Sequence, residues 1–225
     1  EHLAAYIERV MAWCKQEPAL RDVEVYAHAS AGCLHVRPVA NVKTAEGVAV
    51  LERMADFALG LCREYAGAMS GEHGDGLSRS SHNRALFGDE LYTTFQSIKR
   101  TFDPHTLLTP GKIVDAPPLT EHLRMGADYA TAPLETVFDW SDDHGFDRAI
   151  EMCNGSGVCR KVESGIMCPS YMATRDERDS TRGRANALRN ALAGRIPTED
   201  LFSHEMDGVL DLCLGCKACS SECPS

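Results

Sequence analysis

The sequence has no long apolar run, no export signal and no excess of basic residues. Its apolar stretches all fall short of the roughly 18 uninterrupted residues that a membrane-spanning helix needs. The first residues form an amphipathic pattern rather than a signal peptide. A net charge of −10 disfavours nucleic-acid binding. We therefore expect a cytoplasmic protein, or one held peripherally at the inner face of a membrane, with no nucleic-acid partner.

The chain also lacks an initiator methionine, since it begins with Glu1. It stops at Ser225, directly after a cysteine motif. Its 225 residues are enough for one large or two small domains. We expect the chain to be a piece of a longer polypeptide, and the rest of that polypeptide to be its partner.

Cysteine is abundant, and seven of the ten cysteines lie in the last third of the chain, in two runs that each end in Cys-Pro. The first run is Cys153, Cys159 and Cys168, and the second is Cys213, Cys216, Cys219 and Cys223. The second run has the spacing C-x2-C-x2-C-x3-C-P of a 4Fe–4S cluster site. Without an export signal, disulfides are disfavoured. Zinc is the alternative, but four cysteines within eleven residues before a proline favour a cluster.

In two-cluster ferredoxins, the cysteine before the proline binds the other cluster. This rule predicts a 4Fe–4S cluster held by Cys168, Cys213, Cys216 and Cys219. It leaves a second site to Cys153, Cys159 and Cys223. Ser156 stands where the second site would have a fourth cysteine, which resembles the three-iron site in the iron–sulfur subunit of succinate dehydrogenase. Two alternatives stay open there: a 3Fe–4S cluster, or a 4Fe–4S cluster whose fourth iron is held by Ser156 or water.

Residue periodicity indicates a mixed fold without the alternating βαβ rhythm of a doubly wound sheet. The patterns predict helices over 1–16, 45–66, 89–102 and 184–195, and strands over 23–29 and 34–39. Asp89 is the expected cap of the third helix. The predicted class is α+β: an antiparallel sheet with helices, followed by a small, mostly helical cysteine-rich part.

Histidines near the predicted strands indicate a candidate metal site. His28 and His35 flank the turn between the two strands. Glu72 and His73 lie in a glycine-rich loop, residues 70–76, that offers a carboxylate ligand and a base. Two histidines and one carboxylate leave open positions on a divalent metal for a substrate. A histidine taken alone is more often a surface or core residue, so spacing by itself leaves this site undecided.

Three segments of the first half resemble known motifs: residues 26–35 resemble G-H-x-G-D-G-N-L-H, residues 70–74 resemble a Glu-His-Gly motif, and residues 102–112 resemble F-D-P…N-P-G-K. Together they resemble the motifs of the FAD-linked 2-hydroxyacid dehydrogenases of the vanillyl-alcohol oxidase superfamily. The match is to the C-terminal, substrate-side half of such enzymes. The resemblance implies that FAD is bound mostly by an N-terminal half outside this chain.

By this resemblance, His28, His35 and Glu72 hold a divalent metal, zinc by preference, and His73 is the catalytic base. The departures are Ser30-Ala31 in place of Gly-Asp, Cys33 in place of Asn, and Arg37 in place of a shorter polar residue. Losing the Asp weakens the support for the imidazoles. Arg37 is a candidate to bind the substrate carboxylate; a solvated arginine at a strand end is the alternative.

Residues 153–161, 167–171 and 181–184 resemble the ferredoxin segment of large oxidoreductases in which flavin and iron–sulfur parts are fused. The predicted organisation is an oxidase C-terminal domain over 1–118, a linker over 119–145 and an incomplete iron–sulfur domain over 146–225. The predicted function is oxidation of a D-2-hydroxyacid, of the D-lactate or D-2-hydroxyglutarate type. Electrons would pass from FAD through two clusters to an acceptor such as a quinone or cytochrome.

The fragment alone is expected to be inactive because the flavin half is missing. The alternatives are a non-catalytic electron-transfer module and, less favoured, a zinc-stabilised interaction domain.

Overall fold

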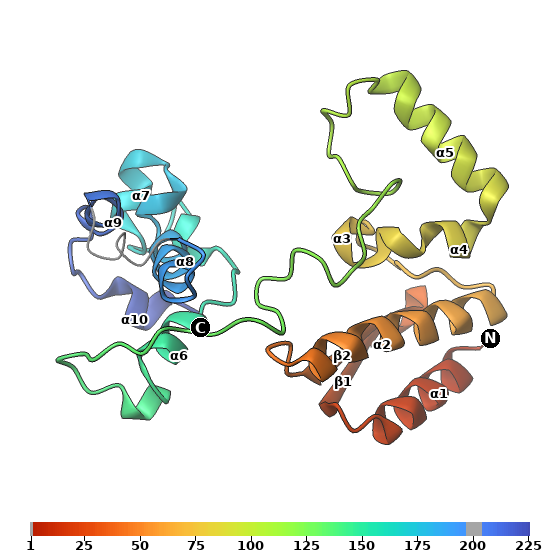
Figure 1. Cartoon of the computed structure of the whole chain (residues 1–225), viewed down its shortest axis with the longest axis horizontal. Helices are drawn as coiled ribbons and strands as arrows, with labels where there is room; N and C mark the ends of the chain where they lie inside the picture. The colour runs from red at the N-terminus through yellow and green to blue at the C-terminus, as the bar shows by residue number, and fades with distance from the viewer. Residues whose placement is uncertain (1, 197–203) are drawn as a thin grey trace. The chain divides into compact units, whose positions relative to one another are not determined.

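The computed structural model describes residues 2–196 and 204–225, and the chain separates into two compact units, 1–129 and 130–225 (Figure 1). Each unit is described by itself. The boundary between them falls inside the segment 119–145.

The first unit is built around a two-stranded antiparallel sheet of β1 (Leu20–His28) and β2 (Cys33–Ala40). Helices α1 (Leu3–Gln16) and α2 (Ala45–Glu64) lie along the sheet (Figure 1). Val23 and Val36 point from the sheet into a cluster with Val10 and Leu61 of the two helices. Because side chains alternate along a strand, the opposite face of the sheet is left free of this core.

Local signals explain where these elements begin and end. The Thr44 hydroxyl accepts a hydrogen bond from the backbone N–H of Gly47 at 3.1 Å and caps α2. α1 ends at Gln16, before Pro18. Between the strands, a single 3-10 turn over Ala29–Ala31 is followed by Gly32 at φ +66°, a left-handed conformation that suits glycine.

Three helices follow in the first unit: α3 (Gly76–Arg79), α4 (Asn83–Phe87) and α5 (Asp89–Phe102). The prediction that Asp89 caps α5 is wrong. Gly88 occupies the cap position at φ +82°, and Asp89 is the first residue of the helix. The Asp89 carboxylate instead accepts a hydrogen bond from Nε of Arg84 at 2.6 Å, because the sharp reversal between α4 and α5 brings the two side chains together.

The second unit is mostly helical. Its helices are α6 (Phe146–Glu151), α7 (Pro169–Thr174), α8 (Thr181–Leu192), α9 (His204–Leu210) and α10 (Ala218–Glu222). α8 begins three residues earlier than predicted because Ser180 caps it, accepting from the N–H of Gly183 at 2.9 Å. The α+β class is confirmed. Among the described residues, no helix is both long and apolar enough to cross a bilayer.

Candidate functional site

The face of the sheet away from the core carries the predicted metal-site residues. His28 ends β1, and His35 lies opposite Tyr26 in the strand register. Arg37 lies two residues beyond His35 on β2 and is paired with Glu24. Paired residues of an antiparallel sheet point to the same side, so these side chains share one face.

The glycine-rich loop brings Glu72 to this face. Its Oε2 lies 3.4 Å from Nε2 of His28, and its Oε1 lies 3.0 Å from Nε2 of His35. One ligand atom from each of the three residues lies within 4.8 Å of the others. Nε2 of His73 is 3.2 Å from Oε1 of the same carboxylate. The structure therefore brings all four residues together, although they come from two strands and a loop.

His35 supplies the strongest sign that these groups fit a cation. Its side chain is only 16% exposed, and its Nε2 is buried without a hydrogen-bond partner, since Glu72 is close but not aligned for a hydrogen bond. A buried polar atom without a partner is costly unless something else satisfies it. The Tyr26 ring stacks on the imidazole with the ring centroids 4.4 Å apart. Two imidazoles and a carboxylate are a donor set that zinc and similar divalent metals accept.

Close packing against β2 holds the loop in place. A Cβ on Gly71 would lie 2.7 Å from Sγ of Cys33, so only glycine lets the loop approach this closely. The Ser70 hydroxyl donates to the backbone carbonyl of His73 and closes the loop. The roles of Gly71 and Tyr26 were missed at the level of sequence, because neither residue carries chemistry that a motif could reveal.

Arg37 lies on the same face, as its strand position requires. Its guanidinium carbon is 5.0 Å from the centroid of the Tyr26 ring. The residue is exposed, so its cationic group is accessible to an anion. This placement is compatible both with binding a substrate carboxylate and with plain solvation.

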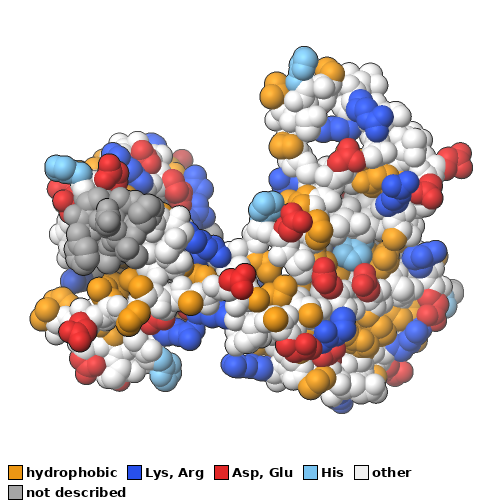
Figure 2. Space-filling view, in the orientation of Figure 1, with side chains coloured by type: hydrophobic (Ala, Val, Ile, Leu, Met, Phe, Trp, Pro, Cys, Tyr) orange, Lys and Arg blue, Asp and Glu red, His pale blue; other side chains and the backbone are white. Residues whose placement is uncertain are grey.

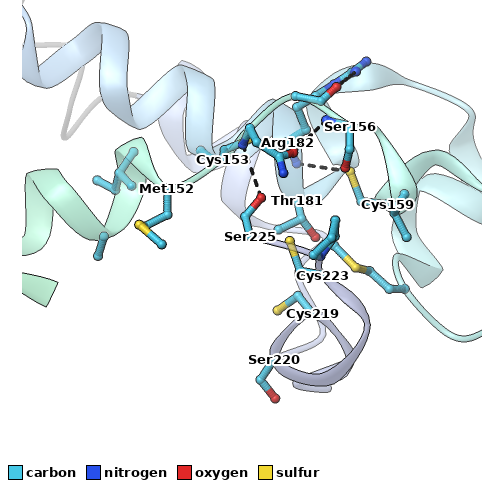
Figure 3. A pocket seen from close by; sticks show the side chains of 18 of the residues that line it. Met152, Cys153, Ser156, Cys159, Thr181, Arg182, Cys219, Ser220, Cys223 and Ser225 are labelled. Atoms are coloured by element: carbon cyan, nitrogen blue, oxygen red, sulfur yellow. Dashed lines mark hydrogen bonds between the residues drawn. The ribbon is translucent and has the colours of Figure 1, made fainter. Parts of the chain in front are cut away.

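The cysteines of the second unit surround two cavities. A cavity of about 150 Å³ is lined by Cys168, Cys213, Cys216 and Cys219. A larger cavity of about 590 Å³ is lined by Cys153, Cys159, Cys219 and Cys223 (Figure 3). Ser156 lines the larger cavity as well. The structure thus groups the cysteines as the crossed-ligand rule does, with Cys219 touching both cavities.

Polar contacts to sulfur show that these cavities suit thiolate ligands. Burial alone would raise the pKa of the Cys168 thiol, but hydrogen bonds from Ser170, from the Tyr171 backbone and from Arg184 outweigh burial and lower it. The backbone N–H of Arg182 donates to Sγ of Cys159 at 3.4 Å (Figure 3). Thiolates are the form that binds iron, so the donor set fits iron–sulfur clusters.

Charges of both signs are interspersed over the face of the molecule shown in Figure 2.

Comparisons with known proteins match the two halves of the chain to two families. Residues 1–113 match the C-terminal domain of FAD linked oxidases, and residues 149–225 match the 4Fe-4S dicluster domain. No solved structure matches the chain.

The chain is also similar to several curated proteins. It is 30% identical to a D-2-hydroxyglutarate dehydrogenase of Escherichia coli over 100% of this chain and 25% of that protein. It is 33% identical to the Pseudomonas putida protein of the same name, over 89% of this chain and 23% of that protein. A mitochondrial D-lactate dehydrogenase [cytochrome] of Arabidopsis thaliana is 31% identical over 40% of this chain and 16% of its own length.

The chain thus spans about a quarter of the length of the first two relatives. Both halves match in the order that the sequence motifs indicate, which confirms the predicted fusion. The chain belongs to the FAD-linked oxidase family, and it joins the C-terminal domain of that family to a 4Fe–4S dicluster domain.

Proposed function

We propose that the polypeptide containing this chain is an FAD- and iron–sulfur-dependent dehydrogenase that oxidises a D-2-hydroxyacid to the 2-oxoacid. The observation that carries this proposal is the convergence of His28, His35 and Glu72 at Nε2 of His35, a buried nitrogen without a hydrogen-bond partner. The relatives that match across most of this chain are named D-2-hydroxyglutarate dehydrogenases, which favours that substrate over D-lactate.

His28, His35 and Glu72 would hold a divalent metal, zinc by preference. When bound, the metal supplies a Lewis acid and FAD supplies the hydride acceptor. In this proposal His73 accepts the proton of the substrate hydroxyl at Nδ1, the ring nitrogen that is not engaged by Glu72, since imidazole is a suitable general base. The Glu72 carboxylate lies 3.2 Å from Nε2 of His73, accepts the N–H of that nitrogen and so orients the ring.

Arg37 binds the carboxylate of the substrate in this proposal. It lies on the same sheet face as His35, two residues away along β2. A guanidinium binds a carboxylate through two parallel hydrogen bonds, which also fixes the orientation of the acid.

The cysteine cavities hold the two clusters that carry electrons away singly. The four cysteines of the smaller cavity bind a 4Fe–4S cluster. Cys153, Cys159 and Cys223 bind a second cluster, of the 3Fe–4S type or of the 4Fe–4S type with Ser156 or water at the fourth iron. We place the final acceptor among quinones and cytochromes. The proposed domains remain 1–118 and 146–225, and the proposed location is the cytoplasm or the inner membrane face.

The test uses the full polypeptide, purified without oxygen, with its bound iron, sulfide and zinc measured. We expect two clusters and reduction of FAD by D-2-hydroxyglutarate or D-lactate, but not by the L-enantiomers. Clusters without any flavin reduction would support the non-catalytic electron-transfer alternative. Stoichiometric zinc in the cysteine-rich part, with almost no iron, would support the zinc-stabilised alternative.

A further inference from the structure

Glu222, the last residue of α10, directly precedes Cys223 and contacts the loop that leads to Cys168. Its Oε1 accepts a hydrogen bond from the backbone N–H of Ile166 at 2.8 Å. Its Oε2 accepts one from the N–H of Met167 at 3.4 Å and lies 2.7 Å from Nζ of Lys161. One carboxylate therefore joins the second cysteine run to the first, across 56 residues of sequence.

The residues around this carboxylate are closely packed. The Glu222 side chain is mostly buried. Gly165 has φ +73°, and a Cβ there would overlap both Oε2 of Glu222 and Nζ of Lys161. The left-handed backbone favours glycine at this position, and a larger residue would require the Glu222 and Lys161 side chains to shift.

The contact lies at the wall between the two cysteine cavities. Met167 donates its backbone N–H to Glu222 and is buried in a cluster with Cys159, Cys168 and Tyr171. Met167 lines both cavities. A change in the position of the Met167 backbone would therefore move the wall that the two cavities share.

We propose that Glu222 is a positioning residue for the two clusters, holding Cys223 of one site at a defined place relative to Cys168 of the other. The inference rests on the proposed iron–sulfur function. A carboxylate suits this role because its two oxygens accept from two backbone N–H groups and an ammonium at once. Loss of a group that orients metal ligands typically lowers metal affinity or activity by about 10–100-fold.

The experiment compares Glu222→Ala and Glu222→Gln with the wild-type full polypeptide, purified without oxygen. The matched control is Glu163→Ala, which removes an exposed acid from the loop between Lys161 and Ile166. Iron and sulfide are measured, together with the rate of iron loss to a chelator and the electron paramagnetic resonance spectrum of the reduced protein.

We expect Glu222→Ala to lose iron about tenfold faster than wild type, the lower end of the effect of losing a group that orients metal ligands. Its spectrum should show altered spin–spin splitting between the clusters, because their spacing changes. A merely structural effect would lower the signal and leave its splitting unchanged. Glu222→Gln retains an oxygen for the Ile166 N–H and should give an intermediate rate with nearly normal splitting.

The inference is overturned if Glu222→Ala and Glu163→Ala both match wild type in iron loss and splitting. It is also overturned if Glu222→Ala and Glu222→Gln lose signal equally with unchanged splitting. A wild-type protein without iron would contradict the proposed clusters themselves, which separates the two failures.

Discussion

At the scale of single residues, the candidate metal site depends on how neighbours constrain ordinary side chains. His35 is held by the stacked Tyr26 ring and has a buried nitrogen without a hydrogen-bond partner. His28 and His73 are exposed by comparison. In the proposed site, His35 is therefore the constrained ligand, whereas His28, the other histidine ligand, and His73, the proposed base, are exposed.

Replacing His73 should remove the base while leaving the metal in place. In the full polypeptide, His73→Asn should slow flavin reduction by roughly 10²–10⁴-fold, the usual contribution of a general base. Bound metal should stay near the wild-type level, whereas His35→Ala should lose it. Stopped-flow flavin reduction and metal analysis test this, with the exposed His122→Asn as control. A wild-type rate in His73→Asn would assign the base elsewhere.

Asp103 is a second residue whose properties come from its partners. Its carboxylate accepts from Nζ of Lys99 at 2.5 Å and from the N–H groups of Leu107 and Leu108 at 2.8 and 2.9 Å. The hydrogen bond from Lys99 is the largest influence, and together with the two N–H groups it outweighs burial and lowers the pKa of Asp103. The stability it contributes is therefore present above its ordinary pKa of about 3.9 and is lost as pH falls through the folded value.

Asp103→Asn should accordingly lower the urea midpoint at pH 7, and its difference from wild type should shrink below about pH 4. Urea unfolding of the full polypeptide followed at several pH values measures the difference. Asp128→Asn changes an exposed aspartate of the same unit and should have little effect at any pH. A difference that grew on acidification would contradict the assigned role.

At the scale of elements, the two long helices and the glycine-rich loop use opposite faces of one small sheet. α1 and α2 bury the face that carries Val23 and Val36. The loop covers the end of the other face, where Gly71 meets Cys33. Because the helices occupy one face only, the histidines on the other stay free to meet Glu72.

The close contact between Gly71 and Cys33 can be tested by placing a larger residue at position 71. Gly71→Ala should place a methyl group 2.7 Å from Sγ of Cys33 and shift the loop, at a cost of about 1–3 kcal/mol, typical of overpacking. Bound metal should fall because Glu72 moves with the loop. Adding Cys33→Ala should restore part of the metal, as measured by titration with zinc. Gly74→Ala, where nothing lies near the added methyl, is the matched control.

At the scale of the whole molecule, the two units have different sources of stability. The first has a helix–sheet core around Val10, Cys14 and Leu61. Among the described residues of the second, one buried cluster consists of Met167 and Tyr171 together with Cys159 and Cys168, which also line the cavities. A small unit of this kind gains folding free energy from its ligated metal.

Removal of the clusters by oxidation and chelation should therefore affect the units unequally. Amide exchange should rise across residues 146–225, while the helices and strands of residues 3–64 stay protected. Hydrogen-exchange mass spectrometry of the full polypeptide before and after removal measures this. Equal loosening of both units would contradict the separate origin of their stability.

The sequence by itself determined the class of the fold, the main elements and the cluster motif. Helical periodicity, the β-branched runs and the spacing C-x2-C-x2-C-x3-C are local properties, so they can be recognised without knowing distant contacts. The same holds for the glycine-rich loop and the two histidines around one turn. The helix caps at Gly88 and Ser180 were not predicted, because a cap depends on the path that the chain takes before the helix.

Only the tertiary structure decided how the distant parts meet. Glu72 reaches His35 because Gly71 packs on Cys33, and Glu222 reaches Met167 because Gly165 leaves room for its carboxylate. The stacking of Tyr26 and the burial of one imidazole nitrogen likewise arise from packing. The contacts of Glu72 and Glu222 join residues tens of positions apart, and close packing in three dimensions, rather than any local pattern, determines which of them form.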